Sequence, residues 1–375
     1  MKITRGYKTE LDLNNKQKTL CLKHAGTARF AFNWALAKKQ EAFKAGKKAP
    51  TAIDLHRELN KLKKTDFLWM YDVSKCAPQE ALRAVDKAYD NFFRKVKLKK
   101  QGQYIGKLGF PKFKAKKKAI GSFRLTGAIH VYEDAIQLPR LGRLRLKEHG
   151  YLPTDTHILS ATVSEQAGRW YVSIQVEEEQ ERKPTTATTA IGVDLGVHTL
   201  ATCSDTTTFE NPRVLKHQLK KLRRLSRAHS RKQKGSNNRE KSRSKLAKLH
   251  ARIANMRKDA VHKLATHLCK NHAWVAIEDL HVNGMLKNHN IAQAIADASM
   301  GEIRRQLTYK AEKFGTRVVV IDRFYPSSKT CSVCKFVLDE LSLNVRKWSC
   351  PNCLTLHDRD VNAAKNILAM SSIDR

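Results

Sequence analysis

Acidic residues and long apolar runs are scarce in this sequence of 375 residues. It has 35 Asp and Glu against 72 Lys and Arg, a formal net charge of +37. A charge of this size would repel itself in a compact fold, so it indicates a polyanionic partner, with nucleic acid first and an anionic membrane surface second. No apolar run reaches the roughly 18 residues of a membrane-spanning helix. This absence weakens the membrane alternative.

The sequence also lacks an export signal and a disulfide pattern. The N-terminal stretch MKITRGYKTELDL alternates polar and apolar residues and has no apolar core of a signal peptide. We therefore expect a cytoplasmic protein in a reducing compartment. The eight cysteines agree with this, because four are scattered singly and four form two close pairs. Close pairs in a reducing compartment are typical of a metal site.

The first half of the chain changes its pattern twice. Residues 1–12 alternate like a short strand, and residues 14–98 then repeat apolar residues at helical spacing, with Asn14 and Pro78 near helix starts. Residues 122–177 alternate again, around a hairpin signal at 166–169. We predict a strand, an all-helical block of three helices, and a small antiparallel sheet or barrel.

A basic strip at residues 94–118 joins the helical block to the sheet. It carries eleven Lys and Arg and no acidic residue, and Lys107, Lys112 and Lys114 flank Phe110 and Phe113. One explanation is a solvated linker, and the other is a strip that binds nucleic acid. We predict that the lysines contact nucleic acid and that the two phenylalanines pack at the entrance of the barrel.

The second half of the chain has a mixed α/β pattern. Two basic helices are predicted within residues 213–258, which hold eighteen Lys and Arg and one acid. Leucines at helical spacing should dock each helix by one face and leave the basic face outward. We expect phosphate contacts from Arg223, Arg224, Arg231 and Lys232. The remaining predicted elements are strands at 190–195, 199–204, 274–280 and 317–322, and a helix near 291–312.

Four cysteines near the C-terminus form the strongest local motif. Cys331 and Cys334 are followed, after fifteen intervening residues, by Cys350 and Cys353. Each pair can offer two thiolates to one tetrahedral Zn²⁺. With all four positions taken by protein, this zinc would be structural and would hold a short segment that has no core of its own. A pair of disulfides is the alternative, and it conflicts with the missing export signal.

Three carboxylates form a second candidate site. Asp194 and Glu278 each end an apolar strand, and Asp360 starts a short amphipathic helix. A lone buried carboxylate is costly unless it is paired or bound to metal. Converging carboxylates bind hard cations such as Mg²⁺ and support two-metal phosphodiester cleavage. Taken singly, Asp360 could be an ordinary helix N-cap and Asp194 a turn residue.

The order of these motifs resembles the TnpB family, also called the insertion-sequence OrfB transposases. This family consists of RNA-guided DNA endonucleases related to the type V CRISPR effectors, with a RuvC-like nuclease domain. The resemblance spans nearly the whole chain and is most specific in its final third. It is carried by ARFAFNWAL (28–36), GFPKFK followed by SFR (109–124), GVDLGVHTLAT (192–202), VAIEDL (275–280), LTYKAEKFGTRVVVIDRFYPSSKTCSVC (307–334), CPNC (350–353) and DRDVNAAKNIL (358–368).

The resemblance implies a multidomain α+β fold: an RNase H-like (RuvC) nuclease domain with an inserted zinc finger, and a wedge β-barrel with an inserted helical recognition lobe. Asp194, Glu278 and Asp360 match the catalytic triad, which would hold two Mg²⁺, and the four cysteines match the zinc finger. Lys335 departs from the family, in which Gly is common after the second cysteine. The implied domains are 1–13 and 112–185 for the barrel, 14–111 for the helical domain, 186–328 and 357–375 for the nuclease, and 329–356 for the zinc finger that binds target nucleic acid.

The implied partners are a guide RNA from the transposon end and a target double-stranded DNA, bound by a protein that is a monomer with its RNA. Two alternatives stay open, and the sequence argues against a third. A guide-free RuvC-like nuclease would recognise DNA by its shape, and a non-cleaving zinc-finger regulator would use the carboxylates structurally. A strand-joining transposase would need a His-hydrophobic-His pair, and no two histidines here lie two residues apart.

Overall fold

The computed structural model of the chain describes residues 2–116, 120–179, 187–342 and 344–372. The chain divides into two compact units, residues 1–180 and 181–375, called here the first and the second unit. The domain boundary predicted at 185/186 lies outside the described residues. Within the described ranges, no helix is long and apolar enough to cross a membrane.

Three long helices form the helical part of the first unit, as the sequence predicts. Both α1 and α2 begin with capping boxes, in which Asn14 and Thr51 accept hydrogen bonds from backbone N–H groups of the first turn. Pro78 lies in the first turn of α3, where its missing N–H costs no hydrogen bond. The bounds are α1 Asn15–Lys44, α2 Ala52–Leu62, the 3₁₀ helix η1 Leu68–Asp72, and α3 Cys76–Lys100.

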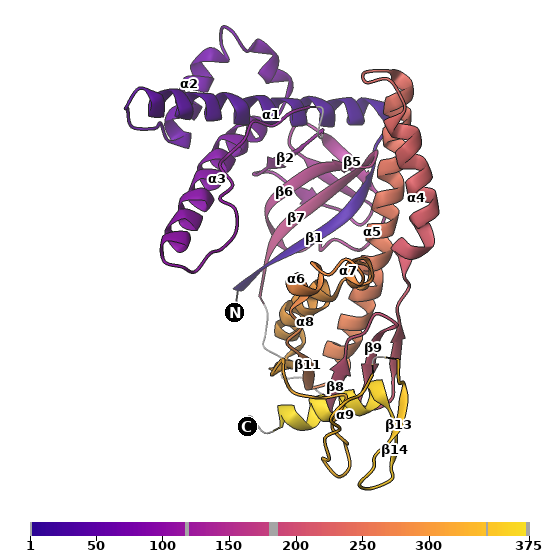
Figure 1. The fold of residues 1–375 in the computed structure, drawn as a ribbon. Coiled ribbons are helices and arrows are strands. Elements are labelled where there is room, and N and C mark those ends of the chain that lie inside the picture. Colours follow the sequence, from indigo (N-terminus) through magenta and orange to yellow (C-terminus); the bar gives the residue numbers. More distant parts are fainter. Residues whose placement is uncertain (1, 117–119, 180–186, 343, 373–375) are drawn as a thin grey trace. The chain divides into compact units, whose positions relative to one another are not determined.

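An antiparallel sheet of seven strands forms the rest of the first unit, in the order β2-β6-β7-β1-β5-β4-β3 (Figure 1). The predicted hairpin turn at Ala167 and Gly168 has φ values of 54° and 84°, as a two-residue hairpin loop requires. The strands are β1 Lys2–Asp12, β2 Ser122–Leu125, β3 His130–Val131, β4 Ala135–Leu138, β5 Gly142–Leu146, β6 His157–Gln166 and β7 Arg169–Glu179.

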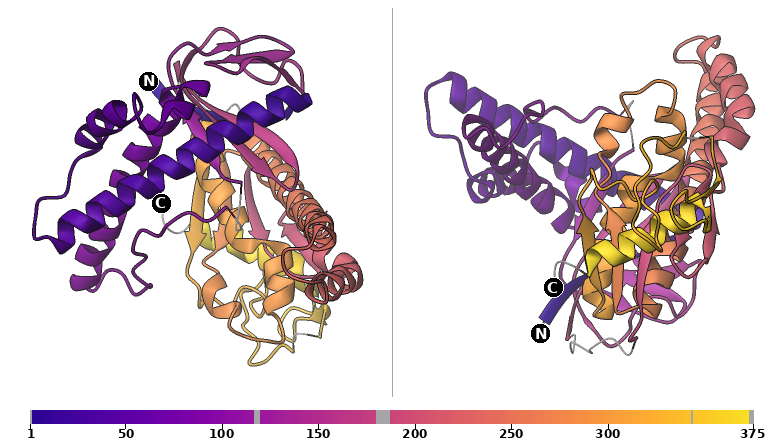
Figure 2. Two further views of the ribbon diagram at one scale, coloured as in Figure 1. Left: turned by 90° about the horizontal axis from the view of Figure 1, so that it is seen from above. Right: turned by 60° about the horizontal axis from the view of Figure 1, so that its bottom comes forward.

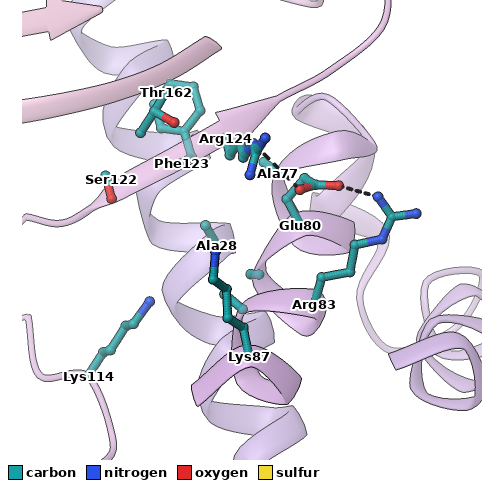
Figure 3. Close-up of a pocket in the computed structure, with 12 residues that line it drawn as sticks. Ala28, Ala77, Glu80, Arg83, Lys87, Lys114, Ser122, Phe123, Arg124 and Thr162 are labelled. Carbon is teal, nitrogen blue, oxygen red and sulfur yellow. Dashed lines mark hydrogen bonds and ion pairs between the residues drawn. The ribbon is translucent and has the colours of Figure 1, made fainter. Parts of the chain in front are cut away.

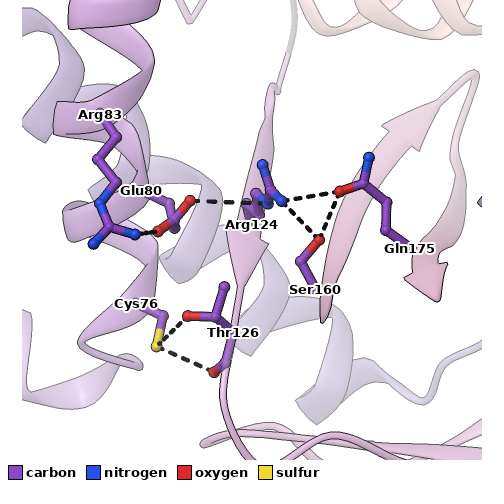
Figure 4. Close-up of polar contacts among 7 residues, drawn as sticks. All are labelled: Cys76, Glu80, Arg83, Arg124, Thr126, Ser160 and Gln175. Atoms are coloured by element: carbon purple, nitrogen blue, oxygen red, sulfur yellow. Dashed lines mark hydrogen bonds and ion pairs between the residues drawn. The ribbon is translucent and has the colours of Figure 1, made fainter. Parts of the chain in front are cut away.

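The helices and the sheet of the first unit share one hydrophobic cluster, which includes Leu36, Leu82 and Ile174. A polar network also joins α3 to the sheet (Figure 4). Arg124 on β2 donates to Ser160 Oγ and Gln175 Oε1, both at 2.9 Å, and its Nε lies 3.8 Å from Glu80 Oε2 on α3. The helical block is therefore packed onto the sheet and does not stand alone.

A five-stranded sheet organises the second unit, in the order β10-β9-β8-β11-β12. The strands β8, β11 and β12 are parallel, and β9 and β10 are antiparallel to their neighbours. The bounds are β8 Ala190–Asp194, β9 Thr199–Cys203, β10 Thr208–Glu210, β11 Trp274–Glu278 and β12 Arg317–Ile321. A separate pair, β13 Lys347–Ser349 and β14 Leu356–Asp358, lies in the cysteine-rich segment.

Six helices accompany this sheet in the described part of the second unit: α4 Val214–Ser230, α5 Asn237–Asn271, α6 Val282–Met285, α7 Ala292–Ala298, α8 Met300–Phe314 and α9 Arg359–Ser371. The single helix predicted near 291–312 is two helices, because Ser299 between them has a φ of 56°. A left-handed residue of this kind breaks the helical hydrogen-bond pattern.

Helices cover both faces of the five-stranded sheet. On β11, Val275 and Ile277 join a cluster with residues of α5 and α8, whereas Trp274 and Ala276 pack with Ile367 of α9. Alternate side chains of a strand point to opposite faces, so α9 covers one face and α5 with α8 the other. The yellow helix α9 lies across the strands in two views (Figures 1 and 2).

Candidate active site and cysteine cluster

Asp194 and Glu278 end two neighbouring parallel strands. The strands β8 and β11 pair with Val193 opposite Ile277, so the next residue of each strand is one of the two acids. Val193 and Ile277 face α5 and α8, and alternation turns Asp194 and Glu278 to the face covered by α9. Both acidic side chains therefore leave the same edge of the sheet on the same face.

A glycine brings the third acid to this edge. A Cβ atom added at Gly192 would lie 2.1 Å from the carbonyl oxygen of Ala364 and 2.8 Å from the N atom of Leu368. Only glycine permits so close an approach of α9 to β8. Asp360 lies about one helical turn before Ala364. The contact at Gly192 thus holds the start of α9 beside the end of β8.

Electrostatics link Asp194 to Glu278 and Asp360, and these three residues are called here the carboxylate cluster. Burial, reinforced by repulsion from Glu278 and Asp360, raises the pKa of Asp194 to about 7. Burial also raises the pKa of Glu278, and the Ser327 hydroxyl bound to it acts in the opposite direction. A cation placed among these groups would relieve both the repulsion and the desolvation. Asp194 thus lies near enough to both other acids to be repelled by them, and the metal-binding and catalytic roles of the three acids stay predictions.

The acids that flank the cluster have structural partners. Asp358 is the N-cap of α9, because its carboxylate accepts from the N–H groups of Asp360 and Val361, both at 3.1 Å. The alternative that Asp360 is the cap is therefore wrong. Asp279 binds Arg304 and Arg323 through its side chain. Asp360 itself has Arg346 Nη1 at 3.4 Å.

The four cysteines meet at one point, and they are called here the cysteine cluster. Their Sγ atoms all lie within 4.8 Å of one another, with Cys331 to Cys353 at 3.6 Å and Cys334 to Cys350 at 3.5 Å. A disulfide needs about 2.05 Å, whereas sulfurs around a tetrahedral zinc with Zn–S of about 2.3 Å lie about 3.8 Å apart. The cysteines are free thiols whose spacing fits a zinc ion.

Both pairs of cysteines use the same turn. The Lys335 N–H donates to the Cys331 carbonyl at 3.0 Å, and the Leu354 N–H donates to the Cys350 carbonyl at 2.9 Å. Lys335 and Leu354 both have positive φ, 67° and 59°. Lys335, where Gly is common in the family, thus occupies a left-handed position that suits glycine.

Sequence reasoning missed several side chains around the two clusters. His357 is buried, its Nε2 lies 3.1 Å from Cys331 Sγ, and its ring packs on Trp348. Its position directly before the motif DRDVNAAKNIL (358–368) was the available signal. Ser327 and Asn366 were also missed, since their hydrogen bonds join segments far apart in the sequence.

The basic helices α4 and α5 pack against each other through apolar residues, as predicted. Val214 and Leu222 of α4 belong to one cluster with Leu249 and Ile253 of α5. Of the predicted phosphate contacts, Arg223 and Arg224 are exposed near the middle of α4. Arg231, which is exposed, and Lys232, which is half-buried, follow the end of this helix. Each helix therefore buries an apolar stripe and leaves cations in solvent.

In the first unit, the basic strip lies partly over the helices. Phe110 contacts the rings of Tyr89 and Phe92 on α3, so the expectation that it packs at the barrel entrance is wrong. Phe113 is 53% exposed and carries little of the core. Lys107 and Lys112 are exposed, and Lys114 Nζ lies 3.8 Å from the centre of the Phe32 ring on α1.

A small pocket beside Lys114 adds cations that the sequence did not single out. Its volume is about 190 Å³, and Arg83, Lys87 and Arg124 line it together with Lys114 (Figure 3). Glu80 opposes two of them, since it binds Arg83 at 2.7 Å and lies near Arg124. The pocket is thus a mainly basic recess between α1, α3 and β2.

Family models match three segments of the chain. "Probable transposase" (OrfB_IS605) matches residues 173–289, "Cas12f1-like, TNB domain" matches 301–367, and "Helix-turn-helix domain" (HTH_OrfB_IS605) matches 1–48. The last segment consists here of strand β1 and the single uninterrupted helix α1. The first two matches contain all three members of the carboxylate cluster and the whole cysteine cluster.

Two curated relatives match over almost the full length. A "Putative RNA-guided DNA endonuclease" of Streptomyces pristinaespiralis is 36% identical over 98% of this chain and 89% of its own length. "Putative RNA-guided DNA endonuclease InsQ" of Escherichia coli K12 is 34% identical over 98% and 92%. Among solved structures, a Cas12f1–sgRNA–target DNA complex matches with a TM-score of 0.57 at 12% identity over 98% of both chains, a likeness of fold.

These matches place the protein among the transposon OrfB proteins. The chain belongs to the TnpB family, which its motifs resemble.

Proposed function

We propose that this protein is an RNA-guided DNA endonuclease of transposon origin that cleaves double-stranded DNA by metal-assisted hydrolysis. One observation carries the proposal: three carboxylates converge at one sheet edge, and the pKa of Asp194 is raised to about 7 by burial and by the other two. Such a cluster suits a divalent cation. Relatives named as RNA-guided DNA endonucleases at 36% and 34% identity support the same interpretation of the site.

The donor sets fit two kinds of metal. The oxygen-only carboxylate cluster fits Mg²⁺, and the four thiols fit Zn²⁺. Two Mg²⁺ held by Asp194, Glu278 and Asp360 would supply an activated water and would stabilise the leaving oxygen. The chain's own contribution is to hold the three carboxylates at one sheet edge and to keep Asp194 half-buried there. The zinc would be structural, because all four ligand positions come from cysteine.

The strand order of the second unit supports an RNase H-like nuclease domain. In this sheet β10, β9 and β8 are antiparallel, and β11 and β12 run parallel to β8. Asp194 and Glu278 lie at the ends of β8 and β11. We assign residues 186–328 and 357–375 to this domain and 329–356 to an inserted zinc finger. In the first unit, we assign 1–13 and 112–185 to a wedge β-barrel and 14–111 to a helical recognition domain.

The partners in this proposal are a guide RNA and a target DNA duplex. Base pairing with the guide would read the sequence, while the protein would bind backbone shape and a short adjacent motif. The net charge of +37 suits the load of two nucleic acids. The protein would act as a monomer with its RNA.

The test is cleavage of a linear duplex in Mg²⁺. The protein is co-expressed with the RNA encoded at its transposon end, and the duplex carries the guide match next to varied flanking sequences. We expect a discrete co-purified RNA and cleavage that disappears when the guide match is scrambled. Equal cleavage by protein freed of RNA would support the guide-free nuclease, and no cleavage in any combination would support the regulator.

A further inference from the structure

The loop after β12 links the carboxylate cluster to the helix that carries Asp360. Ser327 lies in this loop and is buried, with 7% of its surface exposed. Its hydroxyl donates to Glu278 Oε1 at 2.5 Å. The end of β11 fixes the backbone of Glu278, and this hydrogen bond is what holds its carboxylate group.

The same loop is held from the other side by α9. Asn366 is fully buried, and its Nδ2 donates to the carbonyl oxygens of Ser327 at 2.9 Å and Thr330 at 2.6 Å. Both amide hydrogens of Asn366 are therefore used on this loop. Asn362, one turn earlier, donates to the Thr330 carbonyl at 2.7 Å and accepts from the Ser332 N–H at 2.9 Å.

These contacts form a bridge between two members of the carboxylate cluster. It runs from Glu278 to the Ser327 hydroxyl, and from the Ser327 carbonyl to Asn366, which lies less than two turns after Asp360 in α9. We propose that Ser327 and Asn366 are positioning residues that fix the Glu278 carboxylate relative to Asp360 for metal binding. The proposal rests on the proposed nuclease function.

The physical need for such a bridge comes from the length of the glutamate side chain. A free Glu side chain has many rotamers, and fixing it in one of them costs conformational entropy. A metal ligand must be held within about 0.5 Å of its productive position. The Ser327 hydroxyl supplies this restraint through one oxygen and leaves Oε2 for a cation. Asn366 in turn fixes the backbone from which the hydroxyl points.

The bridge also leads directly to the cysteine cluster. Thr330, the second carbonyl held by Asn366, is followed by Cys331, and Ser332 is held by Asn362. A metal ion on the cysteines therefore anchors the far end of the same loop. The coupling between Glu278 and the cysteine cluster should therefore run in one direction. Removal of the metal from the cysteines should disturb the position of Glu278. Removal of the Ser327 hydroxyl should leave the metal on the cysteines.

The experiment compares Ser327→Ala with Ser327→Thr, which keeps a hydroxyl, and with Ser328→Ala, a neighbouring serine as matched control. Each full-length protein is purified with its RNA. Three quantities are measured: the Mg²⁺ concentration for half-maximal cleavage, Mn²⁺ affinity by electron paramagnetic resonance, and zinc per chain. The Asp194→Ala complex supplies the background of Mn²⁺ bound by RNA.

We expect Ser327→Ala to raise the half-saturating Mg²⁺ and to weaken Mn²⁺ binding by about tenfold, the usual effect of removing a partner of a metal ligand. Zinc content should stay at one per chain, Ser327→Thr should recover part of the affinity, and Ser328→Ala should match wild type. Asn366→Ala should shift the metal dependence in the same direction. An unchanged metal dependence in Ser327→Ala, in a wild type that cuts, overturns the inference alone. A wild type that never cuts overturns the proposed function.

Discussion

The second unit contains the cysteine cluster and the carboxylate cluster, and the two are built in opposite ways. The cysteine cluster comes from residues 331–353, where one turn geometry is used twice. The carboxylate cluster comes from β8, β11 and α9, at positions from 194 to 360, and depends on the close contact at Gly192. A local motif makes the first cluster, and tertiary structure makes the second.

The clusters also differ in what holds them together. The segment around the cysteines has a small hydrophobic cluster, whose buried members are Cys331, Trp348 and Cys350. Such a segment depends on its metal to stay folded. The carboxylate cluster sits on a large core, and burial, followed by repulsion from Glu278 and Asp360, raises the pKa of Asp194. Metal should therefore matter for the fold in one cluster and for chemistry in the other.

The largest expected effect is the loss of cleavage on replacing a member of the carboxylate cluster. Asp194→Ala, Glu278→Ala and Asp360→Ala should each lower the cleavage rate by roughly a thousandfold or more, because catalytic groups that act as a unit fail together. Binding of RNA and target DNA should persist, since affinity comes from the many Lys and Arg side chains. Cleavage and gel-shift assays on the same preparations measure both quantities.

The control is Asp358→Asn, which retains an N-cap acceptor for α9 and should keep most of the activity. Asp279→Ala is a poorer control, because it leaves Arg304 and Arg323 without their carboxylate partner. Activity in Asp360→Ala combined with inactivity in Asp358→Asn would refute the assignment of the triad.

Removal of a cysteine should act on folding before it acts on chemistry. Cys350→Ser should lower zinc content to well below one per chain and open residues 329–356 to protease, because this segment has so little core of its own. Cleavage should fall as well, because Arg346, which pairs with Asp360, belongs to this segment and the loop that holds Glu278 adjoins it. Mass spectrometry for zinc and limited proteolysis are the measurements.

Cys269→Ala serves as the matched control, because Cys269 is a buried cysteine outside the cluster. It should keep zinc and the wild-type proteolysis pattern. Full zinc content in Cys350→Ser would remove the contrast between the two clusters.

Neutralising the basic helix should weaken binding while leaving both clusters intact. Replacing Arg223, Arg224, Arg231 and Lys232 with Gln should weaken nucleic-acid binding similarly for all sequences. The slope of log affinity against log salt should flatten by about 0.9 for each duplex phosphate that the protein no longer neutralises. Zinc content should not change. Weakening confined to one target sequence, with an unchanged salt slope, would indicate contacts to bases instead.

Asp194 should reduce stability as well as support cleavage. Its pKa in the fold, about 7, exceeds the ordinary 3.8, so between these values the folded state holds a proton that the unfolded state has released. The stability of protein lacking Mg²⁺ should therefore fall as pH rises from about 4 to 7 and stay lower above it. Asp194→Asn should remove this destabilisation and stabilise the protein at pH 8 by on the order of 4 kcal/mol, the value of about three pKa units.

The measurement is thermal unfolding of zinc-loaded protein without Mg²⁺ at pH 5.5 and pH 8. The rise in melting temperature of Asp194→Asn over the wild type should be larger at pH 8 than at pH 5.5. Added Mg²⁺ should reduce this difference, because it stabilises the wild type. Asp358→Asn is the control for a changed acid outside the cluster. An equal rise in melting temperature at both pH values would show that ionisation of Asp194 does not destabilise the fold.

The two clusters also mark how far sequence reasoning reaches. Cysteine spacing predicts the first cluster because its geometry is local. Strand ends identify Asp194 and Glu278 as candidates. Spacing alone does not separate Asp358 from Asp360. In the structure Asp358 accepts hydrogen bonds from backbone N–H groups and caps α9, whereas Asp360 does not. Packing of Phe110 against α3, the break at Ser299 and the bridge through Ser327 depend on three-dimensional contacts that no periodicity reveals.

The smallest expected effect lies in the turn of the cysteine cluster. Lys335 has a φ of 67°, and a left-handed conformation costs a residue with a Cβ roughly 1–2 kcal/mol. Glycine avoids this cost but loses about 0.5–1 kcal/mol through its freer unfolded chain. Lys335→Gly should therefore stabilise the zinc-bound segment by somewhat under about 1 kcal/mol, which corresponds to a few-fold tighter zinc binding.

Because the second turn repeats the first, Leu354→Gly, at a φ of 59°, should give a gain of similar size. Lys347→Gly is the matched control on the extended strand β13 and should weaken zinc binding, since glycine there has only its entropic disadvantage. Competition with a zinc chelator measures all three variants. Weaker zinc binding in both Lys335→Gly and Leu354→Gly would show that the turns are stabilised by their side chains, and the local account of the cysteine cluster would then fail.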